Sequence, residues 1–402
     1  MSSVGTMDPS AGWARTARDL YGVAMAVFVV TIAIGILNGA DVVEFDRNAL
    51  LTHVHSGTVG WLSLTIVATA FLLFRAADRR LMLTLAVLVP VYVLAFFTGN
   101  LPFRAISGGA LLLAIAWLVV WVWGRFLEGE RTVPRLAVTL GVTSFAYGAV
   151  VGVLIQVAMA MGTTILPGDV VGAHASAMTF GYIVLTAMGV IEWRLRGTRD
   201  LPVLGVIQVA ALFLGGLVIS LALLLGAEQA GGGIYLLTQL VAVVLFVVRV
   251  WPAAMRTRWL DVAPNRFFAL ASVWTVFALI LFMYLVFQVI SDPENPDALP
   301  LNILLASDHA VYIGVLTNIV VGLLSLLVLA RSAAPSWIAH LMFWGINVGL
   351  AVFVVGLIAD VAEIKRIGAP LMGVALLVAL GLIASRLFTS DPDADALEGV
   401  AP

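Results

Sequence analysis

The chain has 402 residues, of which 62% are apolar and only 11% are charged, whereas a soluble domain carries about 25% charged residues. This composition excludes a soluble globular fold, and a net charge of −2 provides no basic surface for nucleic acid. The sequence contains no cysteine, which excludes disulfides, thiolate metal sites and iron–sulfur clusters. Any metal site must therefore use histidine, carboxylate or methionine ligands.

Twelve long apolar segments follow one another along the chain, and a helix of about 20 apolar residues is enough to cross a bilayer. Spanning segments in lipid are helices or closed barrels, and these segments lack the alternation of a barrel strand. We therefore predict an all-α integral membrane protein with about twelve transmembrane helices in the lipid bilayer. The segments cover residues 18–38, 53–75, 81–100, 104–126, 135–162, 173–193, 202–226, 232–250, 267–290, 302–330, 337–358 and 367–388.

Basic residues predict how the chain is oriented, because Lys and Arg accumulate on the cytoplasmic side of a membrane. They flank every second connection, from Arg18 before the first segment to Arg386 near the end of the last, and the alternate loops carry mainly acids. We expect a plasma-membrane protein with both termini in the cytoplasm. Residues 18–388 would form a single transmembrane domain, with cytoplasmic tails at 1–17 and 389–402.

Four of the five histidines occupy matching places. His53 and His55 begin the second apolar segment, His174 begins the sixth, and His309 lies near the start of the tenth. The predicted orientation puts all four toward the outer face. These segments are four apart, which predicts three quasi-repeated four-helix blocks. The blocks would cover about residues 18–126, 135–250 and 267–388.

A local alignment supports this repeat and defines a register. The three segments superimpose on Gly60, Gly181 and Gly314, each seven residues after what we name the first position. Seven residues are nearly two helical turns, so each glycine shares that position's face and could admit a flat macrocycle or a packed helix. Residues two apart are rotated by about 200°, so the first and third positions face opposite ways. The first position holds His53, His174 or Ser307, and the third holds His55, Ser176 or His309.

Imidazoles from two facing helices can hold a haem iron on both axial sides. A haem also needs apolar walls, and aromatic residues follow each histidine, although aromatic residues near helix ends are also common interface anchors. A single histidine at a helix end is often only an interfacial residue, and we interpret His340, which begins the eleventh segment from the other side, in that way. The aromatic wall candidates are Trp61, Phe180, Tyr182 and Tyr312.

These motifs resemble subunit I of the haem-copper oxidase superfamily, nearest to its nitric oxide reductase and C-type cytochrome oxidase branches. His309-Ala-Val-Tyr-Ile-Gly314 is similar to the helix-10 pattern of those enzymes. The stretch from His340 to Gly349, with its Phe-Trp and Asn-Val-Gly, is similar to their helix 11, and His55-Ser-Gly resembles their helix-2 His-Thr-Asn.

The resemblance implies that His55 and His309 are the axial ligands of a low-spin b-type haem. It matches His174 to a ligand of a second metal, copper or non-haem iron, and leaves His53 unassigned. Ser307 stands where the family carries the ligand of a high-spin haem, and residues 201–226 lack the histidine pair of family helix 7. The expected function is electron transfer, or chemistry or sensing of a diatomic gas such as O₂ or NO. A cytochrome or a quinol would be the electron donor, and the incomplete ligand set leaves oxidoreductase turnover open.

Two other functions stay open. Twelve helices with both ends inside are also common among secondary transporters, which need no haem, although no charged residues mark the predicted midplane. A haem- or copper-handling protein of the nitric oxide response is the other alternative. Asp308 would either polarise a haem ligand or cap a helix, and we interpret Glu192 and Glu228 as solvated loop charges.

Overall fold

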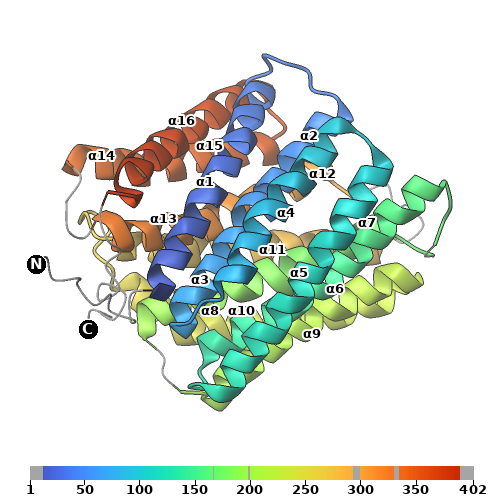
Figure 1. The fold of residues 1–402 in the computed structure, drawn as a ribbon, viewed down its shortest axis with the longest axis horizontal. Helices are drawn as coiled ribbons and strands as arrows, with labels where there is room; N and C mark the ends of the chain where they lie inside the picture. Colours follow the sequence, from blue (N-terminus) through green and yellow to red (C-terminus); the bar gives the residue numbers. More distant parts are fainter. Residues whose placement is uncertain (1–11, 166, 198–199, 293–298, 330–334, 390–402) are drawn as a thin grey trace, which may run out of the picture.

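The computed structural model describes residues 12–165, 167–197, 200–292, 299–329 and 335–389. Within these ranges it contains 12 helices long and apolar enough to cross a membrane. The predicted all-helical architecture is therefore confirmed (Figure 1). The elements are α1 (Gly12–Gly39), α2 (Arg47–His55), η2 (Ser56–Ser63), α3 (Leu64–Phe74), α4 (Arg79–Thr98), α5 (Leu101–Glu128), α6 (Val133–Met161), α7 (Val170–Ser176), η3 (Ala177–Val184), α8 (Leu185–Arg196), α9 (Val203–Leu225), α10 (Glu228–Met255), α11 (Asn265–Ser291), α12 (Leu301–His309), η5 (Ala310–Thr317), α13 (Asn318–Leu324), η6 (Ser325–Leu329), α14 (Ser336–His340), η7 (Leu341–Gly345), α15 (Ile346–Ile358) and α16 (Ala362–Leu387).

The first and last described helices close the bundle. The helices α1 and α16 lie side by side in Figure 1, and the Arg18 guanidinium lies 5.6 Å from the centroid of the Phe388 ring. Helix α1 begins at Gly12, before the first predicted apolar segment, and the predicted cytoplasmic tail of residues 1–17 stays a prediction. Whether this end of the bundle is cytoplasmic stays a prediction.

Several helices begin earlier than the apolar pattern predicted, because polar residues form their first turns. Asp46 caps α2 by accepting a 2.8 Å hydrogen bond from the backbone of Ala49. The helix therefore begins at Arg47, and His53 lies almost two turns inside it. Helix α12 begins at Leu301, so the suggestion that Asp308 caps a helix is wrong.

Three π-helical segments form the centre of the bundle. The segments η2, η3 and η5 are each 8 residues long, and each begins three residues after the first position of the register. In the spans that contain them, between 78% and 89% of the most apolar stretch is buried, against 56% or less in the other described spans. Long π-helices are rare and occur mostly at functional sites. The residues just before these segments, which include the four histidines, are therefore candidates for a functional site.

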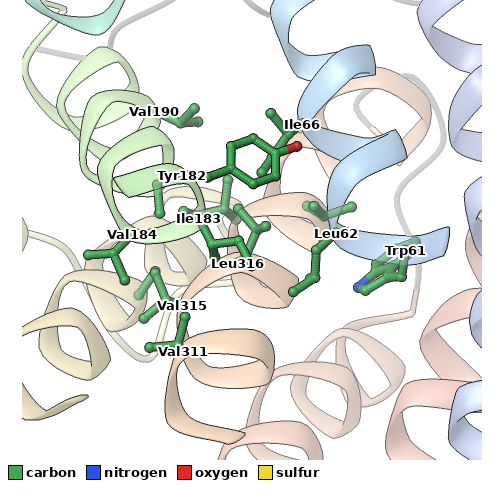
Figure 2. Close-up of a cluster of buried hydrophobic side chains, with 14 of the residues drawn as sticks. Trp61, Leu62, Ile66, Tyr182, Ile183, Val184, Val190, Val311, Val315 and Leu316 are labelled. Carbon is green, nitrogen blue, oxygen red and sulfur yellow. The ribbon is translucent and has the colours of Figure 1, made fainter. Parts of the chain in front are cut away.

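The three segments meet along one buried cluster. Figure 2 shows Leu62, Ile183 and Leu316, each nine residues after the first position, gathered there. Trp61 Nε1 donates a 2.9 Å hydrogen bond to Thr317 Oγ1, which joins η2 to η5. The matching positions are those that a threefold repeat would bring together, and the division into four-helix blocks stays a prediction.

A buried amide pair fixes the part of the bundle that carries the helix-11 motif. Asn318 and Asn347 each donate an Nδ2–H to the other's Oδ1, at 2.8 and 2.9 Å. Trp274 Nε1 also donates to Asn347 Oδ1, at 3.1 Å. These bonds join α13 to α11 and α15, so the asparagine of this motif holds helices together.

Candidate functional site

His53 lies in a groove of helix α1. Its Nδ1 lies 2.9 Å from the carbonyl oxygen of Thr31, and because a carbonyl can only accept, Nδ1 carries the proton. A Cβ built on Gly35 would lie 3.0 Å from His53 Cε1, so the absence of a side chain there makes room for the ring. The imidazole is thus oriented, with Nε2 left to bind another group.

His174 is held in the same way on helix α6. Its Nδ1 donates to the carbonyl oxygen of Gly148 at 2.8 Å, and a Cβ on Gly152 would lie 2.7 Å from its Cε1. These contacts match Gly148 and Gly152 of α6 with Thr31 and Gly35 of α1, each pair being four residues apart.

The neighbouring aromatic contacts extend this match. Phe28 of α1 stacks on Trp61 of η2 with 4.4 Å between ring centroids, and Phe145 of α6 stacks on Tyr182 of η3 at the same distance. Phe28 and Phe145 each lie three residues before the carbonyl that binds the histidine, and Trp61 and Tyr182 each lie eight residues after the histidine. The two helix pairs therefore use one packing scheme.

His55 and His309, at the third position, bond to their own helices. Nδ1 of His55 donates to the Leu51 carbonyl and that of His309 to the Leu305 carbonyl, each at 2.8 Å. In both, the bonded carbonyl is four residues earlier. All four histidines at this end thus have a backbone partner at Nδ1, an arrangement that metal-bound histidines commonly show.

A cavity of about 280 Å³ brings His53 and His309 together between α1, α2, η5, α15 and α16. The exposed side chains of Val54 and Leu305 line it, so it opens to the molecular surface. Asp308 also lines it and contributes a carboxylate. The walls are mostly apolar and include Phe28, Ile32, Ile313, Phe353, Met372 and Leu376.

His55, which the sequence pairs with His309, does not line this cavity, and that pairing stays a prediction. Its ring stacks on Phe96 of α4, with 3.6 Å between centroids and 14° between planes. The rotation of about 200° between residues two apart explains the difference, since it turns His53 toward the cavity and His55 away from it.

Gly60 and Gly314 admit neighbouring helices. A Cβ on Gly60 would lie 2.3 Å from Val27 Cγ1 of α1, and one on Gly314 would lie 2.5 Å from Trp274 Cγ of α11. Of the two roles expected for these glycines, close helix packing is the one they fill, and neither lines the cavity.

Ser307, at the position that the resemblance matches to the ligand of a high-spin haem, is a packed residue of the bundle. Ser307 is fully buried, and its Oγ donates a 2.8 Å hydrogen bond to the Ile303 carbonyl. Gly60, Gly181 and Gly314 face Val27, Ser144 and Trp274 of the adjoining helices. Gly35 and Gly152 lie eight residues after the first two of these helix residues, and the residue eight after Trp274 is Phe282 of α11. Among the residues that the structure describes, no three histidine or acidic side chains come together as a metal cluster.

Two residues of this site were underrated from the sequence. His53 was left unassigned, and its signal is Gly35, which clears space for the ring only once α1 packs on α2. Asp308 was expected either to cap a helix or to polarise a haem ligand, and its position next to a histidine was the available signal. By contrast, Glu192 is not a solvated charge: it is fully buried and forms an ion pair with Arg249 of α10.

The donor atoms at this cavity fit the axial ligation of a haem iron. Two imidazoles on different helices share an apolar space, and each has Nδ1 bonded so that Nε2 is left for the iron. The volume of about 280 Å³ lies just below that of typical ligand sites, which span roughly 300–1,000 Å³. A macrocycle would therefore require the exposed rim residues to turn outward.

A comparison with known protein families finds no family that matches this chain. A comparison with curated proteins finds none that is similar in sequence.

Proposed function

We propose that this chain is a haem b-binding membrane protein of the haem-copper oxidase subunit I type, which transfers electrons or reacts with or senses a diatomic gas. His53 and His309 would hold the haem iron. The observation that carries the proposal is the shared apolar cavity, in which two imidazoles from different helices are both fixed through Nδ1. The resemblance of the motifs around His55, His309 and Asn347 to that family adds support.

A bound haem would supply one-electron redox chemistry at its iron. The protein's own residues would bind and orient the group. Thr31 and Leu305 fix the two imidazole rings through their carbonyls. Asp308 lines the same cavity, where its carboxylate would influence the charge around the ligands. A membrane protein of this kind would take electrons from a cytochrome or a quinol, in a plasma membrane with both termini cytoplasmic.

The test is a reduced-minus-oxidised visible spectrum of the purified protein. We expect a b-type α band that is lost in His53→Ala and in His309→Ala. His340→Asn is the matched control, because His340 lies at the opposite end of the bundle beside Arg266, and it should keep the band. A colourless wild-type protein with full helicity would overturn the proposal.

Carbon monoxide binding tests whether the haem iron has an open coordination position. With imidazoles on both axial sides, the reduced protein should bind little carbon monoxide. Strong binding by the wild type would show that one imidazole is not a ligand and would favour gas chemistry over electron transfer.

A secondary transporter is the second candidate, and Asp308 is the observation that favours it. Ionisable residues at membrane depth usually mark function, and this carboxylate shares a cavity with two imidazoles. A transporter would lose proton-linked uptake in Asp308→Asn and would show no haem band. A haem protein would keep its band in that variant, because the substitution leaves both imidazoles in place.

A further inference from the structure

We propose that the hydroxyls of Thr31 and Ser56 are positioning groups for the haem site, because they close a ring of hydrogen bonds around His53. The inference rests on the proposed function and deepens it, since it names what fixes one of the two imidazoles relative to the cavity.

The ring of hydrogen bonds passes through both ends of Thr31. The Thr31 carbonyl accepts from His53 Nδ1 at 2.9 Å, and Thr31 Oγ1 lies 2.7 Å from Ser56 Oγ. Ser56 Oγ donates to the His53 carbonyl at 3.2 Å. A serine hydroxyl has a single proton to donate, so Thr31 is the donor in the bond between the two hydroxyls. His53 is therefore tied to α1 through its imidazole and, by way of Ser56, through its backbone.

The two hydroxyls are buried where α1 packs on the start of η2. Both Thr31 and Ser56 are buried side chains, and a Cβ built on Gly57 would lie 3.1 Å from Thr31 Cγ2. A hydrogen bond is stronger in such an interior than in water, because the surroundings screen it less. Removing either hydroxyl would leave the other without its partner. The pair therefore holds residue 31 of α1 against the helical turn that carries His53.

The matching site at His174 lacks this pair. His174 donates to the carbonyl of Gly148, which has no side chain. The residue three after His174 is Ala177, whereas the residue three after His53 is Ser56. The two sites share one packing scheme, so that scheme does not itself require the hydroxyls. They are present at the histidine that lines the cavity.

The bond at Nδ1 determines what the Nε2 of His53 offers to an iron. An imidazole whose Nδ1–H donates to a fixed acceptor is held in one tautomer and one orientation, and it is a more basic ligand. A more basic ligand favours ferric over ferrous iron, so this bond affects the reduction potential of the haem as well as its affinity. His309 donates to Leu305 of its own helix, so loosening α1 from η2 would alter the ligand on one side only.

The experiment compares Thr31→Val and Ser56→Ala in the purified full-length protein, since each removes one hydroxyl of the pair. Without haem, NMR with isotope-labelled histidine reports the tautomer of His53, whose signal is assigned by its loss in His53→Ala. We expect the Nδ1–H tautomer in the wild type and an added Nε2–H tautomer in both variants. With haem, we expect binding weakened by about tenfold, the lower end of the range for residues that support metal-bound histidines. The midpoint potential should rise above that of the wild type.

Two further variants and a double variant serve as controls. Because the two hydroxyls form one bond, the effects of Thr31→Val and Ser56→Ala should add to less than their sum in the double variant. Thr31→Ser keeps the donor and should retain the wild-type tautomer and potential. Ser63→Ala is the matched control, because Ser63 is a buried serine of the same segment that donates to the Thr58 carbonyl at 2.9 Å. It should change neither the tautomer nor the potential.

The proposal is overturned if folded Thr31→Val and Ser56→Ala proteins keep the tautomer, haem affinity and potential of the wild type. A lower melting temperature alone would then show that the hydroxyls only hold α1 on η2. If Thr31→Val does not fold, Ser56→Ala breaks the same bond from the other side. A colourless wild type overturns the proposed function and this role together, whereas a coloured wild type with unshifted variants overturns the positioning role alone.

Discussion

Two of the three buried π segments differ from the third in what precedes them. Before η2 and η3, a histidine ring lies against a glycine of the adjoining helix, Gly35 or Gly152. Before η5, the first position is Ser307 and the matching residue of α11 is Phe282, which packs edge-on against Phe180 at 4.6 Å. Here the span carries a small serine in place of the histidine, and the adjoining helix carries a large phenylalanine in place of the glycine. The comparison indicates that one packing scheme can either hold an oriented imidazole or be filled with protein.

The largest expected effect comes from closing the groove that holds His53. Gly35→Leu should displace the imidazole and reduce haem content roughly tenfold to a hundredfold, the equivalent of an overpacking cost of about 1–3 kcal/mol. The reduced-minus-oxidised spectrum measures this loss. Gly109→Leu is the matched control, because a Cβ at Gly109 meets no atom within 4 Å. Equal haem content in both variants would mean that the groove is not needed.

Introducing a histidine at position 307 and a glycine at position 282 tests whether the site before η5 is equivalent to those before η2 and η3. Ser307→His should destabilise the fold by about 3 kcal/mol, because a ring would be forced into a filled site. Adding Phe282→Gly should recover about 1–2 kcal/mol of this loss through their coupling. Thermal unfolding of both single variants and the double variant measures the cycle. If the stability changes of the two single variants simply add in the double variant, positions 307 and 282 are not coupled and the proposed equivalence of the three sites is wrong.

The amide pair near η5 adds a second difference, because the residues that match Asn318 in the register are Leu64 and Leu185. Asn347→Leu should lower stability by about 2 kcal/mol, since it leaves the buried Asn318 amide without its reciprocal partner. Asn302→Ala, whose side chain is exposed and makes a 3.4 Å contact with the Ile358 carbonyl, is the control. Thermal unfolding in the same detergent compares them, and similar melting temperatures would argue against a structural role for the pair.

The smallest effect is expected where η2 meets η5. Trp61→Phe keeps an aromatic ring on Phe28 but removes the donor to Thr317, which should cost about 1 kcal/mol. Trp117→Phe on the exposed face of α5 should change stability less. The haem spectrum should be unchanged in both variants, and a lost α band in Trp61→Phe would assign this contact to the site itself.

Much of the architecture followed from patterns that the chain carries locally. Unbroken apolar stretches predicted the helices, and the spacing around Gly60, Gly181 and Gly314 predicted which spans correspond. Helix starts were placed too late, because the first turn after Asp46 is polar and does not contribute to an apolar pattern. The π segments carry no periodicity that distinguishes them from an α-helix, so they were not predicted.

The sequence by itself determined a twelve-helix membrane bundle, four histidines at one end of it, and a register in which His53 and His55 face opposite ways. Only the tertiary structure decided which histidine faces the cavity, because that depends on where α1 and α4 pack around α2. It placed His53 with His309, and His55 against Phe96. The physical reason is that periodicity along one helix defines the angle between side chains, whereas their partners are set by close packing of helices distant in the chain.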